Sequence, residues 1–224
     1  MSGRVFAAFL SCLASLAQAQ TVCIDPGHPS EVGRGTQGRK VTELHEAWIV
    51  AKAVQRKLAE RRIQVVLTKN SENEFVRNRE RSEIANRARA DFMLRLHCDA
   101  SNESGFGVYY PDREGTSEGV TGPSRAVLLR TLPMARAFHD AMRDALKGKL
   151  FDRGLMPDTR TAVGAKQGAL TGSIYSNCPV VLVEMVVLTN PRDEAFITSK
   201  AGFEAMVDAL TDAAVAALRA VPAR

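Results

Sequence analysis

The sequence contains no apolar run of about 20 residues, the length that a helix needs to cross a bilayer, so we expect no membrane span. Aromatic residues make up only 6% of the chain, so a core has to consist mainly of alanine, valine, leucine and isoleucine. Four cysteines in 224 residues are too few for a small fold held together by disulfides. Basic residues form no dense run interleaved with aromatic residues, which argues against nucleic-acid binding.

What is present is an ordinary globular composition, with 45% hydrophobic and 25% charged residues. The length predicts one domain. A formal net charge of +5 suits an acidic polymer such as a cell wall. We interpret most of one group of arginines as a solvated helix face, namely Arg77, Arg79, Arg81, Arg87 and Arg89.

The first 19 residues have the three parts of a secretory signal peptide. Arg4 gives a positive start, residues 5–16 form a short, mostly apolar run, and residues 17–19 are a small-x-small cleavage pattern. We therefore expect a signal peptide over residues 1–19 and a folded domain over residues 20–224, secreted to the periplasm or the extracellular medium. The alternative is a buried N-terminal helix, although this run has no polar helical face.

Without the first 19 residues, three cysteines remain. We interpret Cys23, Cys98 and Cys178 as small buried apolar residues. A disulfide between two of them is the alternative in an oxidising compartment, and an odd number cannot pair completely within one chain.

Short apolar runs alternate with segments of helical periodicity along the chain. Strands are predicted at residues 21–25, 63–68, 92–97, 105–110 and 179–184. Helices are predicted at residues 43–58, 79–89 and 201–218, and at 124–147, where Pro133 interrupts or starts the helix. Residues 111–123 and 148–178 are predicted as loops. This alternation predicts a single α/β domain with a mainly parallel twisted sheet, flanked by helices on both faces.

Ligands of open α/β sheets bind beyond the carboxyl ends of the strands. The first strand leads to His28, the third ends at His97, and the last ends at Glu184. Glu43 begins the first helix and therefore faces the same edge of the sheet. Two histidines and two glutamates are thus expected to converge there, although they are far apart in the sequence.

Such a set has the composition of a catalytic zinc site, in which three protein ligands leave one position for water. Zinc lowers the pKa of bound water to about 7, and a further carboxylate can then serve as general base. His28, His97 and one glutamate would be the ligands. Glu184 follows an apolar run, and partial desolvation there would raise its pKa towards the range that a base needs.

The residue spacing leaves the glutamate ligand open between Glu43 and Glu46, which lies one turn further along the same helix. No compact zinc motif such as H-E-x-x-H is present. The other two histidines, His45 and His139, lie in helical segments, and we interpret them as surface residues.

Several blocks of the sequence, in the right order, resemble the zinc-dependent N-acetylmuramoyl-L-alanine amidases of the amidase-3 family. The resemblance runs from Thr21 to about Leu218, essentially the whole chain after the predicted signal peptide. The blocks are I-D-P-G-H at residues 24–28, the helix that starts E-x4-W-x2-A at 43–51, V-V-L-T at 65–68, R-x3-A-N-x3-A-D at 81–91, L-H-C-D-A at 96–100, and V-E with L-T-N-P at 183–191.

The resemblance implies zinc held by His28, Glu43 and His97, with Glu184 as the catalytic carboxylate. It also favours Glu43 over Glu46, because Trp48 and Ala51 fix the register of the helix. The implied reaction is hydrolysis of the amide between the lactyl group of N-acetylmuramic acid and the L-alanine of the peptidoglycan stem peptide. Residues 20–224 would then be a catalytic amidase domain.

The chain departs from the family pattern at Pro29, Arg95, Asp99 and residues 186–187, and we expect these changes to affect substrate preference rather than the hydrolytic class. Two other functions stay open. One is a peptidoglycan-binding protein that has lost catalysis, and the other is a zinc peptidase that cuts within the stem peptide. The expected partner is peptidoglycan, and the sequence does not specify whether another protein activates the enzyme.

Overall fold

The computed structural model describes residues 20–222, so the predicted signal peptide lies outside the described residues. The strands are β1 (Thr21–Pro26), β2 (Gln64–Leu67), β3 (Phe92–Asp99), β4 (Phe106–Tyr110), β5 (Gly115–Ser117), β6 (Val120–Gly122), β7 (Asp152–Pro157) and β8 (Val180–Val187). The helices are α1 (Glu43–Glu60), α2 (Asn78–Arg87), α3 (Arg125–Leu146), a 3-10 turn (Asp158–Arg160), α4 (Ala162–Gln167), α5 (Thr171–Ile174), α6 (Pro191–Thr198) and α7 (Lys200–Arg219).

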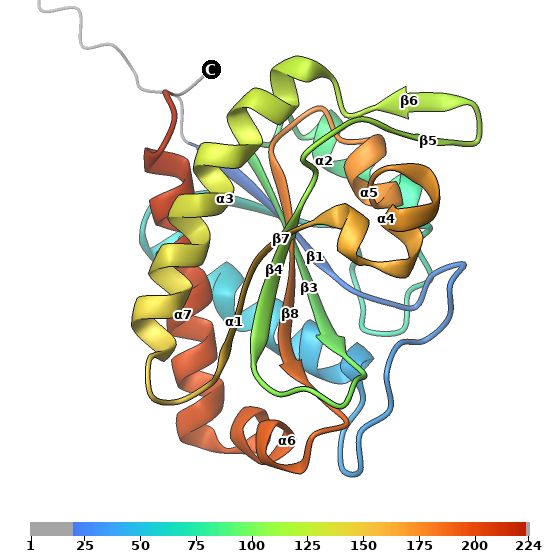
Figure 1. The fold of residues 1–224 in the computed structure, drawn as a ribbon. Coiled ribbons are helices and arrows are strands. Elements are labelled where there is room, and N and C mark those ends of the chain that lie inside the picture. Colours follow the sequence, from blue (N-terminus) through green and yellow to red (C-terminus); the bar gives the residue numbers. More distant parts are fainter. Residues whose placement is uncertain (1–19, 223–224) are drawn as a thin grey trace, which may run out of the picture.

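Six strands form one sheet in the order β2-β1-β3-β8-β4-β7. β2, β1, β3 and β8 run parallel, whereas β4 is antiparallel to β8 and β7 is parallel to β4. The starts of β4 and β7 therefore lie at the edge where β1, β3 and β8 end, which is the lower edge in Figure 1. Helices α1, α3 and α7 cover one face, and α2, α4 and α5 lie on the other side, so the predicted α/β class is confirmed (Figure 1).

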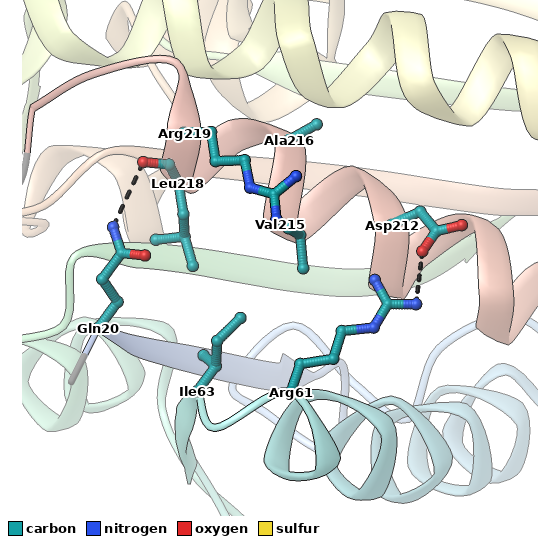
Figure 2. Close-up of a pocket in the computed structure, with 8 residues that line it drawn as sticks. All are labelled: Gln20, Arg61, Ile63, Asp212, Val215, Ala216, Leu218 and Arg219. Carbon is teal, nitrogen blue, oxygen red and sulfur yellow. Dashed lines mark hydrogen bonds and ion pairs between the residues drawn. The ribbon is translucent and has the colours of Figure 1, made fainter.

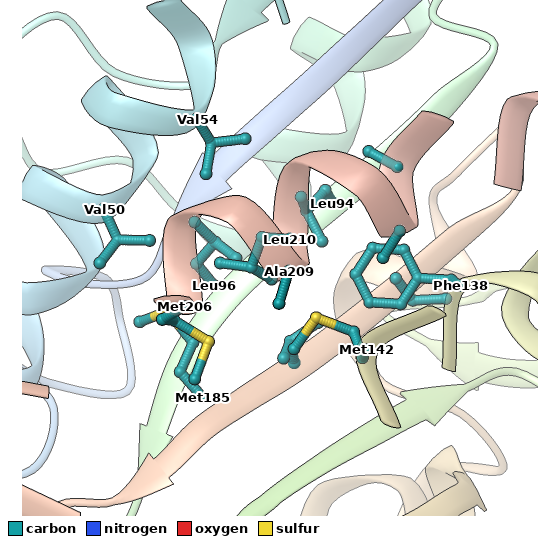
Figure 3. Packing of buried hydrophobic residues seen from close by; sticks show 14 of the residues in the cluster. Val50, Val54, Leu94, Leu96, Phe138, Met142, Met185, Met206, Ala209 and Leu210 are labelled. Atoms are coloured by element: carbon teal, nitrogen blue, oxygen red, sulfur yellow. The ribbon is translucent and has the colours of Figure 1, made fainter. Parts of the chain in front are cut away.

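The main hydrophobic core lies between the sheet and α1, α3 and α7 (Figure 3). Alternate strand residues, such as Val22 and Ile24 of β1, point into it because successive side chains of a strand face opposite sides. Their intervening neighbours face α2, where a second, smaller apolar cluster contains Cys23, Met93 and Ala85. Each strand therefore has one face in the large core and one face available for polar groups.

Capping residues explain where the long helices begin. Thr42 accepts a hydrogen bond from the backbone nitrogen of His45 at 3.1 Å, which fixes the start of α1 beside the carboxyl edge of the sheet. α3 begins at Arg125 and continues through Pro133, so the expected break at Pro133 is wrong. The buried face of α3 packs into the main core, and this packing outweighs the hydrogen bond that proline removes.

Several segments predicted as loops are ordered elements. Residues 148–178 contain the edge strand β7 and short helices, and residues 111–123 contain the β5–β6 hairpin, so both loop predictions are wrong. Gly154 in β7 has a φ of +96°, and Pro157 ends the strand, which hides the alternation that usually marks a strand. None of the helices between residues 20 and 222 combines the length and apolar character of a membrane span.

Candidate active site

Two rows of polar side chains cross the face of the sheet that α2 covers. In the first row, Asp25 of β1 lies beside Arg95 of β3. In the second row, His97 of β3 pairs with Glu184 of β8, which in turn faces Gly107 of β4. Since residues in register share a face, the predicted base and one predicted ligand are neighbours on the sheet surface. β3 and β8 extend beyond His97 and Glu184, so both side chains stand on this face rather than at the very ends of their strands.

His28, Glu43 and His97 come together at the end of β1. Each offers one ligand atom, and these atoms lie within 4.8 Å of one another, which makes them the one such group of histidine, cysteine and acid side chains within residues 20–222. Oε1 of Glu43 lies 2.8 Å from Nδ1 of His97 and 3.3 Å from Nε2 of His28. The two imidazole rings are 5.2 Å apart and nearly perpendicular. Two imidazoles and a carboxylate are the donor set that a catalytic zinc ion takes.

Hydrogen bonds fix the orientation of these side chains. Nδ1 of His28 lies 3.0 Å from the carbonyl oxygen of Gly33, so with Nδ1 donating there, Nε2 is left as the ligand atom. Oε2 of Glu43 accepts from the backbone nitrogen of Thr36 at 2.7 Å. Nε2 of His97 is buried without a hydrogen-bond partner. An orphaned ring nitrogen of this kind is costly to bury unless something binds it.

The pKa values of Glu43, His28 and His97 are shifted because the three side chains are buried close together. Burial would raise the pKa of Glu43, but hydrogen bonds from both histidines hold it well below its ordinary value. Burial opposes protonation of His28, yet Glu43 raises its pKa overall. For His97 burial dominates and lowers the pKa. The carboxylate and the uncharged His97 ring are the forms that bind a metal ion.

Gly27 and Gly35 have no side chains, and this leaves room for His97, Glu43 and His28. A Cβ on Gly27 would lie 2.6 Å from the His97 ring, and a Cβ on Gly35 would lie 2.6 Å from Oε2 of Glu43 and from the His28 ring. Gly35 also has a φ of +86°, a conformation that other residues rarely adopt. The loop between β1 and α1 can therefore wrap closely around the group only with glycine at these positions.

Glu184 lies in the middle of this face, and its Oε2 atom is buried without a hydrogen-bond partner. Burial raises the pKa of Glu184 well above its ordinary value, and the nearby negative charges of Glu43 and Asp99 add to this shift. A carboxyl group of raised pKa can accept a proton and return it near neutral pH.

A buried ionic network lies beneath His28. Asp25 is fully buried, with Arg81 donating to Oδ1 at 2.6 Å and Arg95 to Oδ2 at 2.9 Å. Thr68 also donates to Oδ1 at 2.6 Å. Burial alone would raise the pKa of Asp25, but the two guanidinium groups hold it far below its usual range. Asp25 is therefore a permanent carboxylate that orders two arginines.

The same network fixes the backbone on both sides of His28. Arg81 donates to the carbonyl oxygens of Pro26 at 2.7 Å and Pro29 at 2.9 Å. The ammonium group of Lys69 donates to the carbonyl oxygens of Gly27 and His28. All four carbonyl groups from residue 26 to residue 29 thus face buried cations, and they hold His28 at its left-handed φ of 55°.

Other predictions about this region need correction or are resolved. Arg81 is 1% exposed and does not belong to a solvated face. Its spacing of four residues from the buried Ala85 places it on the inner side of α2, a signal that the charge of arginine hides. Glu46 lies outside the ligand group, and His45 is exposed as predicted. His139 is not a surface residue, because its side chain is 12% exposed and pairs with Asp152 at 2.9 Å.

A cavity of about 530 Å³ lies at the opposite end of the sheet from His28, between the ends of α1 and α7 (Figure 2). Two contacts join residues that line it, since Arg61 pairs with Asp212 at 2.6 Å and Gln20 donates to the carbonyl oxygen of Leu218 at 3.3 Å. The cavity does not contain the residues assigned to the predicted zinc site.

Cys23, Cys98 and Cys178 are all buried, as predicted.

One protein family matches this chain over nearly its whole described length. Residues 22–216 match the Amidase_3 family, described as N-acetylmuramoyl-L-alanine amidase. No significant match was found among curated proteins.

Solved structures similar to this chain include three amidases. Ami1 of Mycobacterium abscessus is 23% identical, covers 89% of this chain and 98% of its own, and has a TM-score of 0.72. AmiC2 of Nostoc punctiforme is 21% identical over 88% of this chain and 95% of its own, with a TM-score of 0.68. The CwlD amidase of Clostridioides difficile, solved in complex with the GerS lipoprotein, is 15% identical over 89% and 98%, with a TM-score of 0.70. At this level of identity the structures establish a shared fold.

The family match spans nearly the whole described chain and agrees with the resemblance found in the sequence blocks. The chain therefore belongs to the Amidase_3 family and is an N-acetylmuramoyl-L-alanine amidase, an enzyme that hydrolyses the amide between N-acetylmuramic acid and L-alanine in the cell wall.

Proposed function

We propose that this amidase is a secreted zinc enzyme in which His28, Glu43 and His97 hold the ion and Glu184 transfers the proton. The observation that carries the proposal is the convergence of the three proposed ligand side chains beside a fourth side chain, the buried Glu184. Catalytic zinc sites combine such a ligand set with an acid–base residue outside it.

The residues fit the ion in ways that do not depend on the family. Two imidazoles and one carboxylate present ligand atoms within 4.8 Å of one another. On His97, Nδ1 is the ring nitrogen that faces the other two ligands, because it lies 2.8 Å from Oε1 of Glu43. The other nitrogen of His28 is already anchored to a backbone carbonyl group, as is usual for histidine ligands of metals.

When bound, zinc supplies Lewis acidity, which polarises the amide carbonyl group and makes water acidic enough to attack near neutral pH. Glu184 then has two tasks. It accepts the proton of the attacking water, and it delivers that proton to the nitrogen of the departing L-alanine. Its burial supports this role, because the raised pKa lets the same carboxyl group hold and release a proton in one cycle.

Replacing Glu184 by glutamine tests the assignment, because the amide keeps the shape of the side chain but cannot carry the proton. We expect E184Q to retain bound zinc by elemental analysis and to lose about 10²–10⁴-fold in the release of stem peptides from purified peptidoglycan. E204Q, at an exposed position on α7, is the matched control and should keep full activity. Undiminished activity of E184Q would remove Glu184 from the mechanism.

Product analysis distinguishes the amidase reaction from the two alternative functions. An amidase releases an intact peptide with a free L-alanine amine, whereas a peptidase releases shorter fragments, and a protein that only binds peptidoglycan releases neither. Mass spectrometry of the soluble products distinguishes all three.

Export is proposed from the N-terminal sequence pattern alone. If residues 1–19 are a signal peptide, the mass of the protein recovered outside the cytoplasm should correspond to a chain that begins at Gln20. A full-length chain found in the cytoplasm would contradict it.

A further inference from the structure

A second cavity, of about 410 Å³, lies beside the proposed active site, at the start of β7. Glu103 and Ser104 line it from the loop after β3, and Phe151, Arg153, Met156 and Arg160 line it from the segment around β7. Because β7 runs antiparallel to β8, its beginning lies at the same edge of the sheet as the ends of β3 and β8. The proposed function assigns no role to this cavity.

Arg153 connects the cavity with Glu184. The guanidinium group of Arg153 lies over Gly107, the residue that faces Glu184 on the neighbouring strand, and a Cβ on Gly107 would be 3.6 Å from two of its nitrogens. It donates to Asp99 at 2.7 Å and to the hydroxyl group of Tyr109 at 3.1 Å. These bonds fix the plane of the guanidinium group next to the reacting centre.

One edge of Arg153 is left for a ligand. Its side chain is 6% exposed, and its buried Nε atom has no hydrogen-bond partner. The carboxylate of Glu103 lies 3.2 Å from Nε without hydrogen-bond geometry, and that side chain is 67% exposed. Because the Glu103 side of this pair is exposed, its carboxylate can turn into water, and another carboxylate can take its place beside Arg153.

The remaining lining residues suit a peptide. Arg160 adds a second guanidinium group to the same cavity, and Phe151, although apolar, is 67% exposed. Planar guanidinium groups bind carboxylates in preference to neutral groups, and exposed apolar side chains favour the aliphatic part of a ligand.

The chemistry of the substrate indicates which part of it can bind in this cavity. The lactyl carboxyl group of N-acetylmuramic acid is consumed in the scissile amide, so the free carboxylates near this bond belong to the peptide. We propose that the cavity is the subsite for the stem peptide, where Arg153 and Arg160 bind one of its free carboxylates. This inference rests on the proposed function, and it places the peptide over β4 and β7 rather than over the His28 loop.

Two soluble muramoyl peptides test the proposal, one with free carboxylates and one with the same groups converted to amides. The wild-type enzyme should prefer the free form by about tenfold in kcat/KM, the value of one lost charge-assisted contact. In R160Q this preference should fall towards one. E103Q should increase it, because the competing carboxylate is gone. R136Q, an exposed arginine on α3, is the matched control and should retain the wild-type preference.

Equal cleavage of the two substrates by the wild-type enzyme, or an unchanged preference in R160Q, would overturn the subsite while leaving the amidase reaction intact. Cleavage of neither substrate in the presence of zinc would instead contradict the proposed function. In that case, calorimetric titration of the zinc-free protein with an acidic alanyl peptide still tests the subsite. Binding that weakens about tenfold in R160Q would support it, and binding unaffected by R160Q would overturn it.

Discussion

Removing the charge of Asp25 should destabilise the enzyme more than any surface substitution of the same kind. In D25N the side chain keeps its volume, but Arg81 and Arg95 stay buried without their shared carboxylate. Breaking a buried ion pair by removing one partner costs about 3–5 kcal/mol. Because domains of this size are stable by about 5–15 kcal/mol, the loss should be obvious in urea unfolding.

D212N is the matched control. Asp212 also pairs with an arginine, Arg61 at 2.6 Å, but its side chain is 55% exposed and the pair lies in water. The same substitution there should cost less than about 1 kcal/mol. If D25N and D212N lower the free energy of unfolding equally, the buried network is not what holds this part of the fold.

The pH dependence provides a second check. Because the pKa of Asp25 is lower in the folded than in the unfolded chain, protons bind more readily to the unfolded state. The contribution of Asp25 is therefore fully present at neutral pH and is lost as the pH falls below the unfolded value of about 3.9. The difference between wild type and D25N should stay constant between about pH 6 and 8 and shrink below about pH 4.

Three further predictions concern the same site. T68V removes a hydrogen bond of 2.6 Å to Asp25, and the free energy of unfolding in urea should fall by about 1.5–3 kcal/mol. Zinc at 100 times its dissociation constant should raise that free energy by about 2.7 kcal/mol, and H97A should abolish the increase. G35A should weaken zinc binding, measured by competition with a chelator, because its Cβ would crowd Glu43 and His28, whereas G119A should not, because Gly119, between β5 and β6, has a similar left-handed φ of +78° but open space around it. Equal zinc affinities in G35A and G119A would exclude crowding as the cause.

Much of the fold could be predicted because its central strands are strongly patterned. β8 is a nearly uninterrupted apolar run, which is typical of strands covered on both faces, and β1 and β3 are mostly apolar. The edge strand β7 could not be predicted, since half-buried residues and a glycine break its pattern. The continuity of α3 through Pro133 depends on packing against the rest of the core, which local propensity does not contain.

The candidate site could also be predicted only in part. That His28, Glu43 and His97 share one edge followed from the ends of parallel strands and the start of α1. The buried cations around them could not be predicted from the sequence, because burial of an arginine or lysine depends on acceptors supplied by distant segments. Arg81 needs Asp25, and Arg153 lies in a segment that the sequence presents as a loop.

The sheet separates two kinds of residue. One of its faces carries the large apolar core, and the other carries Asp25, Arg95, His97 and Glu184. Substitutions that thermostabilise the enzyme are therefore best sought beneath α3 and α7, where repacking leaves the reaction untouched. Variants with altered selectivity should instead come from the side of β4 and β7 that holds Tyr109 and Arg153, so the two properties can be engineered independently.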